Sequence, residues 1–440
     1  MQIQTYAPAD TYCNKILPLR QQMDVCNGWL KERLETVIPM LMDREGVDMW
    51  IVIAREYNED PVIMSMLPAP AMSARRRTIL VFARDKEGNI ARYTVSRYGL
   101  DGYYEAVWNP DKEAQYDRLA RLIMEHEPKS IGINTSKTFA FGDGLSYTEY
   151  VHLVAALTKL GEAGKPYIKR LQGAERLAVG WLEHRIPAEL TVYPGLVEIG
   201  HAIIAEAFSS CTIQPGITTT DDVVWWMREK IQSMGLQAWF QPSIKIQAPG
   251  QGVDDPSNNP PGKTKSSIRK LILPGDLLHC DMGFHYLGLA TDQQQHAYVR
   301  KSGEEDAPAG LKAALAEGNR LQDILMAQIK IGLTGNEVLA ATLAQAKTEN
   351  LTPSVYTHPL GYHGHAAGPV IGLWDRQDGV PGTGDYQLFD STVYSIELNV
   401  TKAVPEWGGQ VVRIALEEDA VLVDGQMRWL SGRQTIFHLI

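Results

Sequence analysis

Two aspartates stand on neighbouring predicted strands in the second half of the chain. The apolar runs Asp276–Asp281 and Leu289–Val299 are typical of strands, and the glycine-containing turn between them predicts a hairpin. Asp281 and Asp292 lie one on each run, eleven positions apart. Adjacent carboxylates repel each other unless a cation lies between them or one of them stays protonated. The pair therefore indicates a metal site, and two aspartates that cap a surface turn are the structural alternative.

Three histidines are clustered in the glycine-rich segment THPLGYHGHAAG, namely His358, His363 and His365. The whole chain has 11 histidines, so three within eight residues is a local concentration. Glycines let a backbone approach a bound group closely, and neutral imidazole is a common metal ligand. The segment therefore offers candidate ligands, unless these rings only pack the turn.

Three glutamates follow in two strand-like segments near the C-terminus. Glu397 is the single ionisable residue of the apolar run STVYSIELNV, where a buried carboxylate is costly unless it is paired or bound to a metal. Glu417 and Glu418 lie between two further apolar runs, in VVRIALEEDAVLV. An edge-strand glutamate and an acidic turn are the structural alternatives for these positions.

The composition limits the class of protein. With 440 residues, 44% of them hydrophobic and 21% charged, the chain is typical of a globular protein with two domains. A net charge of −10, with no basic run longer than Arg75–Arg77, argues against a nucleic-acid partner. The sequence has no run of 18 apolar residues and no signal-peptide pattern, so we expect no membrane partner. Four cysteines without CxxC spacing fit free thiols, and we expect a cytoplasmic protein.

Residues 1–180 are predicted to form an α/β domain. Helices and strands alternate there, and no glycine-rich phosphate loop occurs. We expect helices at 17–45, 112–126 and 147–160, strands at 48–54, 130–136 and 167–171, and a hairpin at 77–97. The polar segment REYNEDP follows the first strand, where a loop can border a site or simply be solvated.

Residues 181–440 change to long helices separated by hairpins, which predicts an α+β domain. Long helices at 195–209 and 310–330 are each followed by a capped amphipathic helix and by strands. Gly216-Ile217-Thr218 matches Gly332-Leu333-Thr334 at an offset of 116. This repeat predicts two pseudo-symmetric halves, and a cleft between such halves is a usual place for a site.

The order Asp, Asp, His, Glu, Glu on successive strands resembles the pita-bread metallopeptidase family, in its branch of aminopeptidase P, prolidase and creatinase. The resemblance covers nearly the whole chain, because residues 1–180 are similar to the creatinase-type N-terminal domain of that branch. Residues 181–440 would be the pita-bread metallohydrolase domain. The metal ligands that the resemblance implies are Asp281, Asp292, His365, Glu397 and Glu417, with Glu418 as the open alternative to Glu417.

The resemblance also implies a chemistry. Such a site holds two divalent metal ions about 3.5–4 Å apart, and its oxygen and nitrogen donors suit Mn²⁺, Co²⁺ or Zn²⁺. Asp292 and Glu417 would bridge the ions, and a metal-bridging hydroxide would attack the substrate. Glu397 would also move a proton to the leaving amine, and His358 and His363 are candidates for a catalytic role beside it.

The chain departs from the family at two histidine positions. The peptidases carry one histidine at about Gly262–Lys263 of this chain and another seven residues past the ligand histidine. With His365 as the ligand, that second position is Gly372. These histidines orient the substrate in the relatives, so the substrate is less certain than the metal site.

The resemblance implies an Xaa-Pro aminopeptidase or prolidase-like peptidase that acts on a small peptide or amide substrate. It also implies a homodimer, in which REYNEDP of a neighbouring subunit could close the cleft. A metallohydrolase of the same fold that acts on a small non-peptide amide is one alternative, and the two missing histidines favour it. A pita-bread pseudoenzyme that acts as a binding module is the other, and the complete ligand set argues against it.

Overall fold

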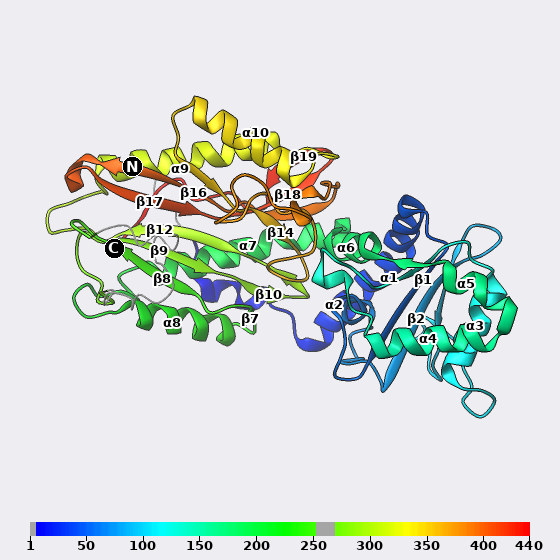
Figure 1. The fold of residues 1–440 in the computed structure, drawn as a ribbon. Coiled ribbons are helices and arrows are strands. Elements are labelled where there is room, and N and C mark those ends of the chain that lie inside the picture. Colours follow the sequence, from blue (N-terminus) through cyan, green and yellow to red (C-terminus); the bar gives the residue numbers. More distant parts are fainter. Residues whose placement is uncertain (1–5, 252–268) are drawn as a thin grey trace. The chain divides into compact units, whose positions relative to one another are not determined.

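The chain divides at Ile186 into two structural units, each with its own hydrophobic core (Figure 1). The structure is a computed structural model that describes residues 6–251 and 269–440. One unit is Pro18–Ile186, and the other is Pro187–Ile440 together with residues 6–17. The predicted combination of an α/β unit followed by an α+β unit is therefore confirmed.

Residues 6–17 belong with the C-terminal unit, whereas the sequence pattern places them in the N-terminal domain. The 3-10 helix η1 (Ala9–Lys15) packs against helix α7 (Pro187–Ala207) of the C-terminal unit. The amide of Ala9 donates a hydrogen bond to Glu206 at 3.2 Å, and Lys230 forms an ion pair with Asp10 at 2.8 Å. These polar contacts between distant positions cannot be read from a local sequence pattern.

A six-stranded sheet forms the middle of the N-terminal unit, in the order β4-β3-β2-β1-β5-β6. Strand β1 pairs antiparallel with β2 and parallel with β5. The strands are β1 (Met49–Arg55), β2 (Arg77–Arg84), β3 (Ile90–Thr94), β4 (Glu105–Ala106), β5 (Ile131–Ile133) and β6 (Leu171–Gly173). The helices are α1 (Leu19–Glu45), α2 (Pro61–Met66), α3 (Gln115–His126), α4 (Tyr147–Lys159), α5 (Lys165–Lys169) and α6 (Glu175–Glu183).

The central strand β1 is buried on both faces, which explains its uninterrupted apolar sequence. Met49, Ile51 and Ile53 alternate onto one face, where they share a core with residues of α3 and α4. Trp50 lies on the other face, and its indole N–H donates to Asn134 at 2.8 Å.

The predicted strand at 167–171 is wrong in part. Residues 165–169 form the short helix α5, and the strand β6 begins only at Leu171. Pro166 lies in the first turn of α5, a place that favours helix initiation because proline lacks the N–H that would be unpaired there. The helix therefore overrides the short apolar pattern of Tyr167 and Ile168.

The C-terminal unit consists of two similar halves (Figure 1). In each half, an antiparallel three-stranded arrangement packs against two helices. The first half contains α7 (Pro187–Ala207), α8 (Thr220–Ser233), β8 (Ser243–Gln247), β9 (Leu277–Met282) and β12 (Gln293–Tyr298). The second contains α9 (Ala309–Gln328), α10 (Gly335–Thr348), β13 (Pro353–Val355), β16 (Leu398–Val404) and β17 (Gln410–Leu416).

A further sheet, in the order β14-β15-β18-β19, lies in the same unit. Its strands are β14 (His358–Leu360), β15 (Thr392–Ser395), β18 (Asp419–Val423) and β19 (Gln426–Trp429). The short strands β7 (Gln237–Ala238), β10 (Phe284–Tyr286), β11 (Leu289–Ala290) and β20 (His438–Leu439) complete the unit among the described residues. Among the same residues, no helix has the length and apolar character needed to cross a bilayer.

Matching capping boxes begin the second helix of each half. The hydroxyl of Thr219 accepts from the Asp222 amide at α8, and Thr334 does the same for Glu337 at α10. The repeat seen in the sequence is therefore structural. The cap Thr219 follows the Gly-Ile-Thr triplet of the first half, whereas the cap Thr334 is the last residue of the Gly-Leu-Thr triplet of the second.

The predicted hairpin is the antiparallel pair β9 and β12, which carries the small hairpin β10–β11 at its tip. Tyr286 pairs with Leu289, so the tip is a two-residue turn. Both turn residues have positive φ, 53° at Leu287 and 74° at Gly288, which is the geometry of a type I′ turn. The β9–β12 ladder keeps the register that this turn sets, so the turn also fixes which residues of β9 and β12 lie opposite each other.

Candidate metal centre

Three adjacent strand segments place Asp281, Gln294 and Glu417 side by side. Gln294 of β12 is the register partner of Asp281 of β9. An isolated bridge joins Gln294 to Glu417 through main-chain hydrogen bonds of 3.0 and 3.2 Å. Residues that pair across adjacent strands project from the same face of the sheet. The three side chains therefore form one row.

Glu397 extends this row from the two-residue gap between β15 and β16, so the apolar run that the sequence predicts as one strand is divided at this glutamate. Leu398 pairs with Leu416 in the β16–β17 ladder, and the β15–β18 ladder keeps the same register. Continuing that register by one residue places Glu397 opposite Glu417. A carboxylate from each of two neighbouring segments thus points to one face.

His358 and Asp292 lie in a second row, one pleat away from the first. His358 is the register partner of Ser395, which is two residues before Glu397. Asp292 is two residues before Gln294. Side chains two positions apart on a strand share a face, so both rows face the same space.

The His358 ring lies at the centre of the carboxylates. Its Nε2 atom is 3.4 Å from Glu417, 3.7 Å from Asp292 and 3.9 Å from Glu397. Its Nδ1 atom lies 3.0 Å from the carbonyl oxygen of Pro359, which can only accept a hydrogen bond. In the neutral ring the proton is therefore on Nδ1, and the lone pair of Nε2 faces the carboxylates.

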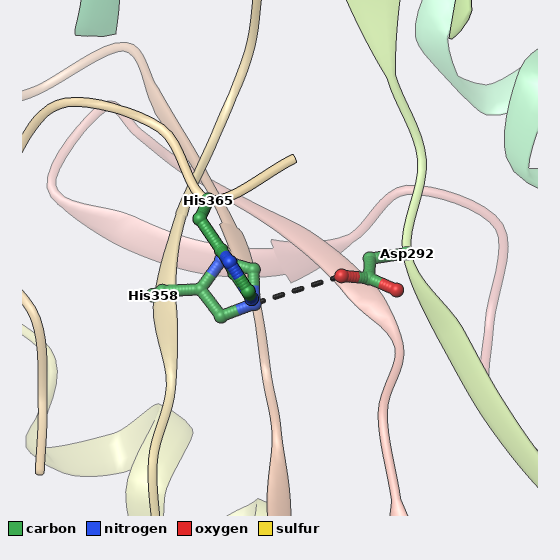
Figure 2. A group of neighbouring side chains, drawn as sticks. All are labelled: Asp292, His358 and His365. Carbon is green, nitrogen blue, oxygen red and sulfur yellow. Dashed lines mark ion pairs between the residues drawn. The ribbon is translucent and has the colours of Figure 1, made fainter. Parts of the chain in front are cut away.

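Figure 2 shows the His358 ring directed at the carboxylate of Asp292. Both residues are buried, and neither Nε2 of His358 nor Oδ1 of Asp292 has a hydrogen-bond partner. A buried acceptor without a partner costs roughly 1–3 kcal/mol. The unpartnered Nε2 of His358 faces the Asp292 carboxylate, and a bound cation would satisfy it.

His365 lies at the open side of this group. Its ring is perpendicular to that of His358, with 4.7 Å between centroids (Figure 2). It also contacts the ring of Trp239, with 5.3 Å between centroids. Solvent reaches His365, yet partial burial lowers its pKa, as does the neighbouring His358. His363 lies near His285 instead, and their proximity contributes to the lowered pKa of His285.

Glu417 and Glu418 point to different partners. Glu417 faces His358 and accepts a hydrogen bond from Ser395 at 2.5 Å. Glu418 lies 2.5 Å from Nε2 of the fully buried His201 and accepts from Gln295 at 2.8 Å. Consecutive residues on an extended chain point to opposite faces, so only Glu417 faces the other carboxylates.

Burial dominates the electrostatics of the carboxylates. It raises the pKa of Asp281 to about 8, with the charge of Glu417 as the second cause. Burial also raises the pKa of Asp292 and of Glu397 well above their ordinary values, and the charge of Glu417 again adds to the effect. Without a cation, the ionised forms of these groups are thus disfavoured. A divalent cation among them would reverse that preference.

The donor set fits divalent cations. Three overlapping groups have ligand atoms within 4.8 Å of one another: Asp281, Asp292 and Glu417; His358, Glu397 and Glu417; and Asp292, His358 and His365. Their atoms are carboxylate oxygens and imidazole nitrogens without thiolates, which suits Mn²⁺, Co²⁺ or Zn²⁺. The groups share Asp292, Glu417 and His358, so the structure offers adjoining positions for cations.

Gln294 was not among the candidates that the sequence pattern indicated. Its sequence signal is its position two residues after Asp292, which on a strand predicts the same face. Its residue type gives no such signal, because the amide is uncharged, unlike the four carboxylates.

Gly372 has a φ of 75°, and a Cβ there would meet the carbonyl oxygen of Val355. A histidine therefore cannot fit at that position. The candidate position at 262–263 lies outside the described residues.

Comparison with known proteins places these residues in context. A sequence model of metallopeptidase family M24 matches residues 196–424, which include every candidate ligand. None of the curated proteins searched matches the chain.

Solved structures share the fold across both units. The X-Pro aminopeptidase from Thermotoga maritima MSB8 is 15% identical, with a TM-score of 0.59 over 90% of this chain and 99% of that chain. Dipeptidase PepE from Mycobacterium ulcerans is 17% identical, with a TM-score of 0.60 over 94% and 98%. The N-terminal domain of FACT complex subunit SPT16 from Cicer arietinum is 10% identical, with a TM-score of 0.55 over 93% and 97%. The two-unit pita-bread fold is thus common to all three.

Proposed function

The chain belongs to metallopeptidase family M24, and from this premise we propose that it is a dinuclear metal-dependent hydrolase of the Xaa-Pro aminopeptidase or prolidase type. The observation that carries the proposal is the convergence of four carboxylates and one imidazole on one face of the C-terminal unit. They are Asp281, Asp292, His358, Glu397 and Glu417. The proposal includes two ions, Mn²⁺, Co²⁺ or Zn²⁺, at the adjoining positions.

The imidazole ligand in this proposal is His358, whereas the resemblance alone implies His365. Support comes from the buried Nε2 of His358, which faces three carboxylates within 3.9 Å. The family's second histidine stands seven residues past the ligand histidine. Counted from His358, that position is His365. The peptide-handling histidine is then present, which weakens the case for a non-peptide substrate.

The side chains have separate tasks in the cleavage of an amide bond. Bound divalent cations would supply an activated water and positive charge for the developing oxyanion. Glu397 accepts a proton from the attacking water and delivers it to the leaving amine nitrogen as the C–N bond breaks. His365 stays neutral at pH 7, because its pKa is lowered, and can donate an N–H to the substrate carbonyl. Trp239 packs edge-on against this ring.

A peptide panel tests this function. Metal-free protein is reconstituted separately with Mn²⁺, Co²⁺ and Zn²⁺ and incubated with Xaa-Pro dipeptides, Xaa-Pro-Xaa tripeptides, and matched peptides with alanine in place of proline. We expect metal-dependent release of the N-terminal residue, with faster cleavage before proline. The Asp292→Asn variant, purified in parallel, controls for contaminating peptidases.

Two other outcomes separate the alternatives. Metal-loaded, folded protein that cleaves small non-peptide amides and no peptide would support the metallohydrolase with another substrate. Folded protein that binds no divalent ion and cleaves nothing would support a binding module, a role compatible with the fold shared with the SPT16 domain. Either outcome excludes the peptidase proposal.

The homodimer and the cytoplasmic location stay part of the proposal. The segment Arg55–Pro61 begins at the last residue of strand β1, and Tyr57 within it is largely exposed. Light scattering after size-exclusion chromatography measures the mass of the particle directly. A mass near 48.9 kDa, that of one chain, would exclude the dimer.

A further inference from the structure

Gln294 forms hydrogen bonds to two of the proposed metal ligands, Glu397 and Glu417. Its Nε2 group donates to Oε2 of Glu417 at 2.6 Å and also to Oε1 of Glu397. An amide –NH₂ has two hydrogens, so it can serve one oxygen of each glutamate. The amide therefore ties together the carboxylates of two neighbouring segments.

A buried histidine sets the direction of this amide. Nε2 of His279 lies 2.8 Å from Oε1 of Gln294, and the carbonyl oxygen can only accept. His279 must therefore donate from Nε2. With the carbonyl bonded to His279, the –NH₂ group has to face the glutamates.

The ring of His279 is itself held in place. It lies 4.9 Å from the ring of His296, between centroids. His296 donates from Nδ1 to the carbonyl oxygen of Leu278 at 3.0 Å and accepts from the amide of Ala415 at 3.0 Å. Both nitrogens of His296 are thus bonded to main chain in neighbouring strands. The orientation of Gln294 therefore depends on groups that are fixed by the sheet.

Each glutamate is left with one carboxylate oxygen toward the ligand histidine. Oε1 of Glu417 is 3.4 Å from Nε2 of His358, and Oε2 of Glu397 is 3.9 Å from the same atom. The oxygens bonded to Gln294 are the other two. Free rotation of either carboxylate would exchange these oxygens and cost entropy when a cation is bound. Because the amide is neutral, it holds them without competing for the cation site.

We propose that Gln294, oriented by His279, is a positioning residue that presents Glu397 and Glu417 to the cation beside His358. The inference rests on the proposed function only in that the site holds a divalent ion. Loss of an outer hydrogen-bond partner typically weakens metal binding 10–100-fold. The same loss is expected here for the cation held by His358, and a smaller one for the cation beside Asp281.

The Gln294→Met variant tests the proposal, because methionine has similar length and no N–H. Gln293→Met is the matched control. Its amide lies on the opposite face of the same strand and donates to the carbonyl oxygen of Val197 at 3.1 Å. Affinity for Mn²⁺ is measured by calorimetric titration of the metal-free proteins, and the coordination by the visible spectrum of Co²⁺. Neither readout depends on turnover.

We expect Gln294→Met to raise the Kd of the cation held by His358 about 10–100-fold and to change the Co²⁺ spectrum. Gln293→Met should leave both unchanged. His279→Phe, which keeps a ring but removes the orienting N–H, should move both readouts in the same direction by less, and it replaces the first variant if Gln294→Met does not fold.

Two results would overturn the inference: wild-type affinity and spectrum in Gln294→Met, or an equal loss in Gln293→Met. A wild-type protein that binds no divalent ion would instead refute the metal centre and the proposed function together.

Discussion

Replacement of His358 by alanine is the most direct test of the metal centre. Among the described ion pairs, Nε2 of His358 is the one atom that lies within 3.9 Å of all three carboxylates, those of Asp292, Glu397 and Glu417. It is buried and has no hydrogen-bond partner, so its lone pair is available to a cation. Removing it should weaken metal binding more than the loss of any residue that only surrounds the ligands.

The expected magnitude follows from linkage. Loss of an outer partner weakens metal binding about 10–100-fold, so loss of a ligand should weaken it at least ~100-fold. A cation at 100 times its Kd stabilises the fold by about 2.7 kcal/mol. After a 100-fold weakening, the same concentration equals the new Kd, and the stabilisation falls to about 0.4 kcal/mol. The difference of about 2.3 kcal/mol corresponds to roughly 5–9 °C in Tm for a unit of this size.

The assay compares the Tm of each variant with and without Mn²⁺. In the metal-free protein, His358→Ala removes an unsatisfied buried nitrogen, a gain of about 1–3 kcal/mol, and creates a cavity, a loss of about 2–5 kcal/mol. These changes occur in both samples of the variant and cancel in the difference. His365→Ala is the comparison. Its ring is exposed, so we expect a near-normal metal-induced shift together with a lower kcat/KM.

The opposite pattern would refute the ligand assignment. If His365→Ala abolishes the metal-induced rise in Tm while His358→Ala keeps it, then His365 is the ligand, as the resemblance alone implies. If both variants keep the full rise, neither imidazole binds the ion, and the centre consists of carboxylates.

The remaining predictions concern pH, the adjacent glutamates and the first aspartate. Burial raises the pKa of Asp281 to about 8 from its ordinary 3.8 in the metal-free fold, so the fold favours the protonated carboxyl. The stability that the protonated carboxyl contributes is complete below about pH 4 and is lost as the pH rises to about 8. Metal binding needs the ionised carboxylate, so the rise in Tm on adding Mn²⁺ should grow from about pH 5 to about pH 8, and a pH-independent rise would contradict this. Glu417→Gln should lower Mn²⁺ affinity at least ~10-fold, whereas Glu418→Gln, which faces His201, should mainly lower stability; calorimetric titration and thermal melts distinguish them. Asp281→Asn should lower the number of bound ions from two to one, as measured by elemental analysis, and an unchanged metal content would exclude Asp281 as a ligand.

Local patterns predicted most of the secondary structure and marked the carboxylates of the centre as candidates. The helix at 17–45, the strand at 48–54 and the hairpin at 77–97 are confirmed. Apolar spacing and a final glycine mark the helix, a continuous apolar run marks the strand, and a glycine-containing turn marks the hairpin. The strand at 167–171 failed because a proline at the start of a short helix outweighed two apolar residues.

In the metal centre, local sequence indicated the candidate carboxylates, and strand register decided between the two histidines. Local sequence marked five carboxylates as candidates, because charged groups in apolar strands are costly whatever the partner strand: Asp281, Asp292, Glu397, Glu417 and Glu418. The choice of ligands among them came from the resemblance, with Glu418 left open beside Glu417. His358 and His365 were not separable by such reasoning, since both stand among glycines in one turn-rich segment. The register of β14 against β15 separates them, because it places His358 opposite Ser395 and thus on the face of the glutamates.

The sequence by itself therefore determined the kinds of group at the site and their order along the chain, since residue type and local period are properties of each segment alone. Tertiary structure decided which of these groups meet. The pairing of β12 with residue 417 brings Gln294 between Asp281 and two glutamates, and it turns Glu418 away toward His201. The physical reason is the pleat: a register shift of one residue would send every one of these side chains to the other face.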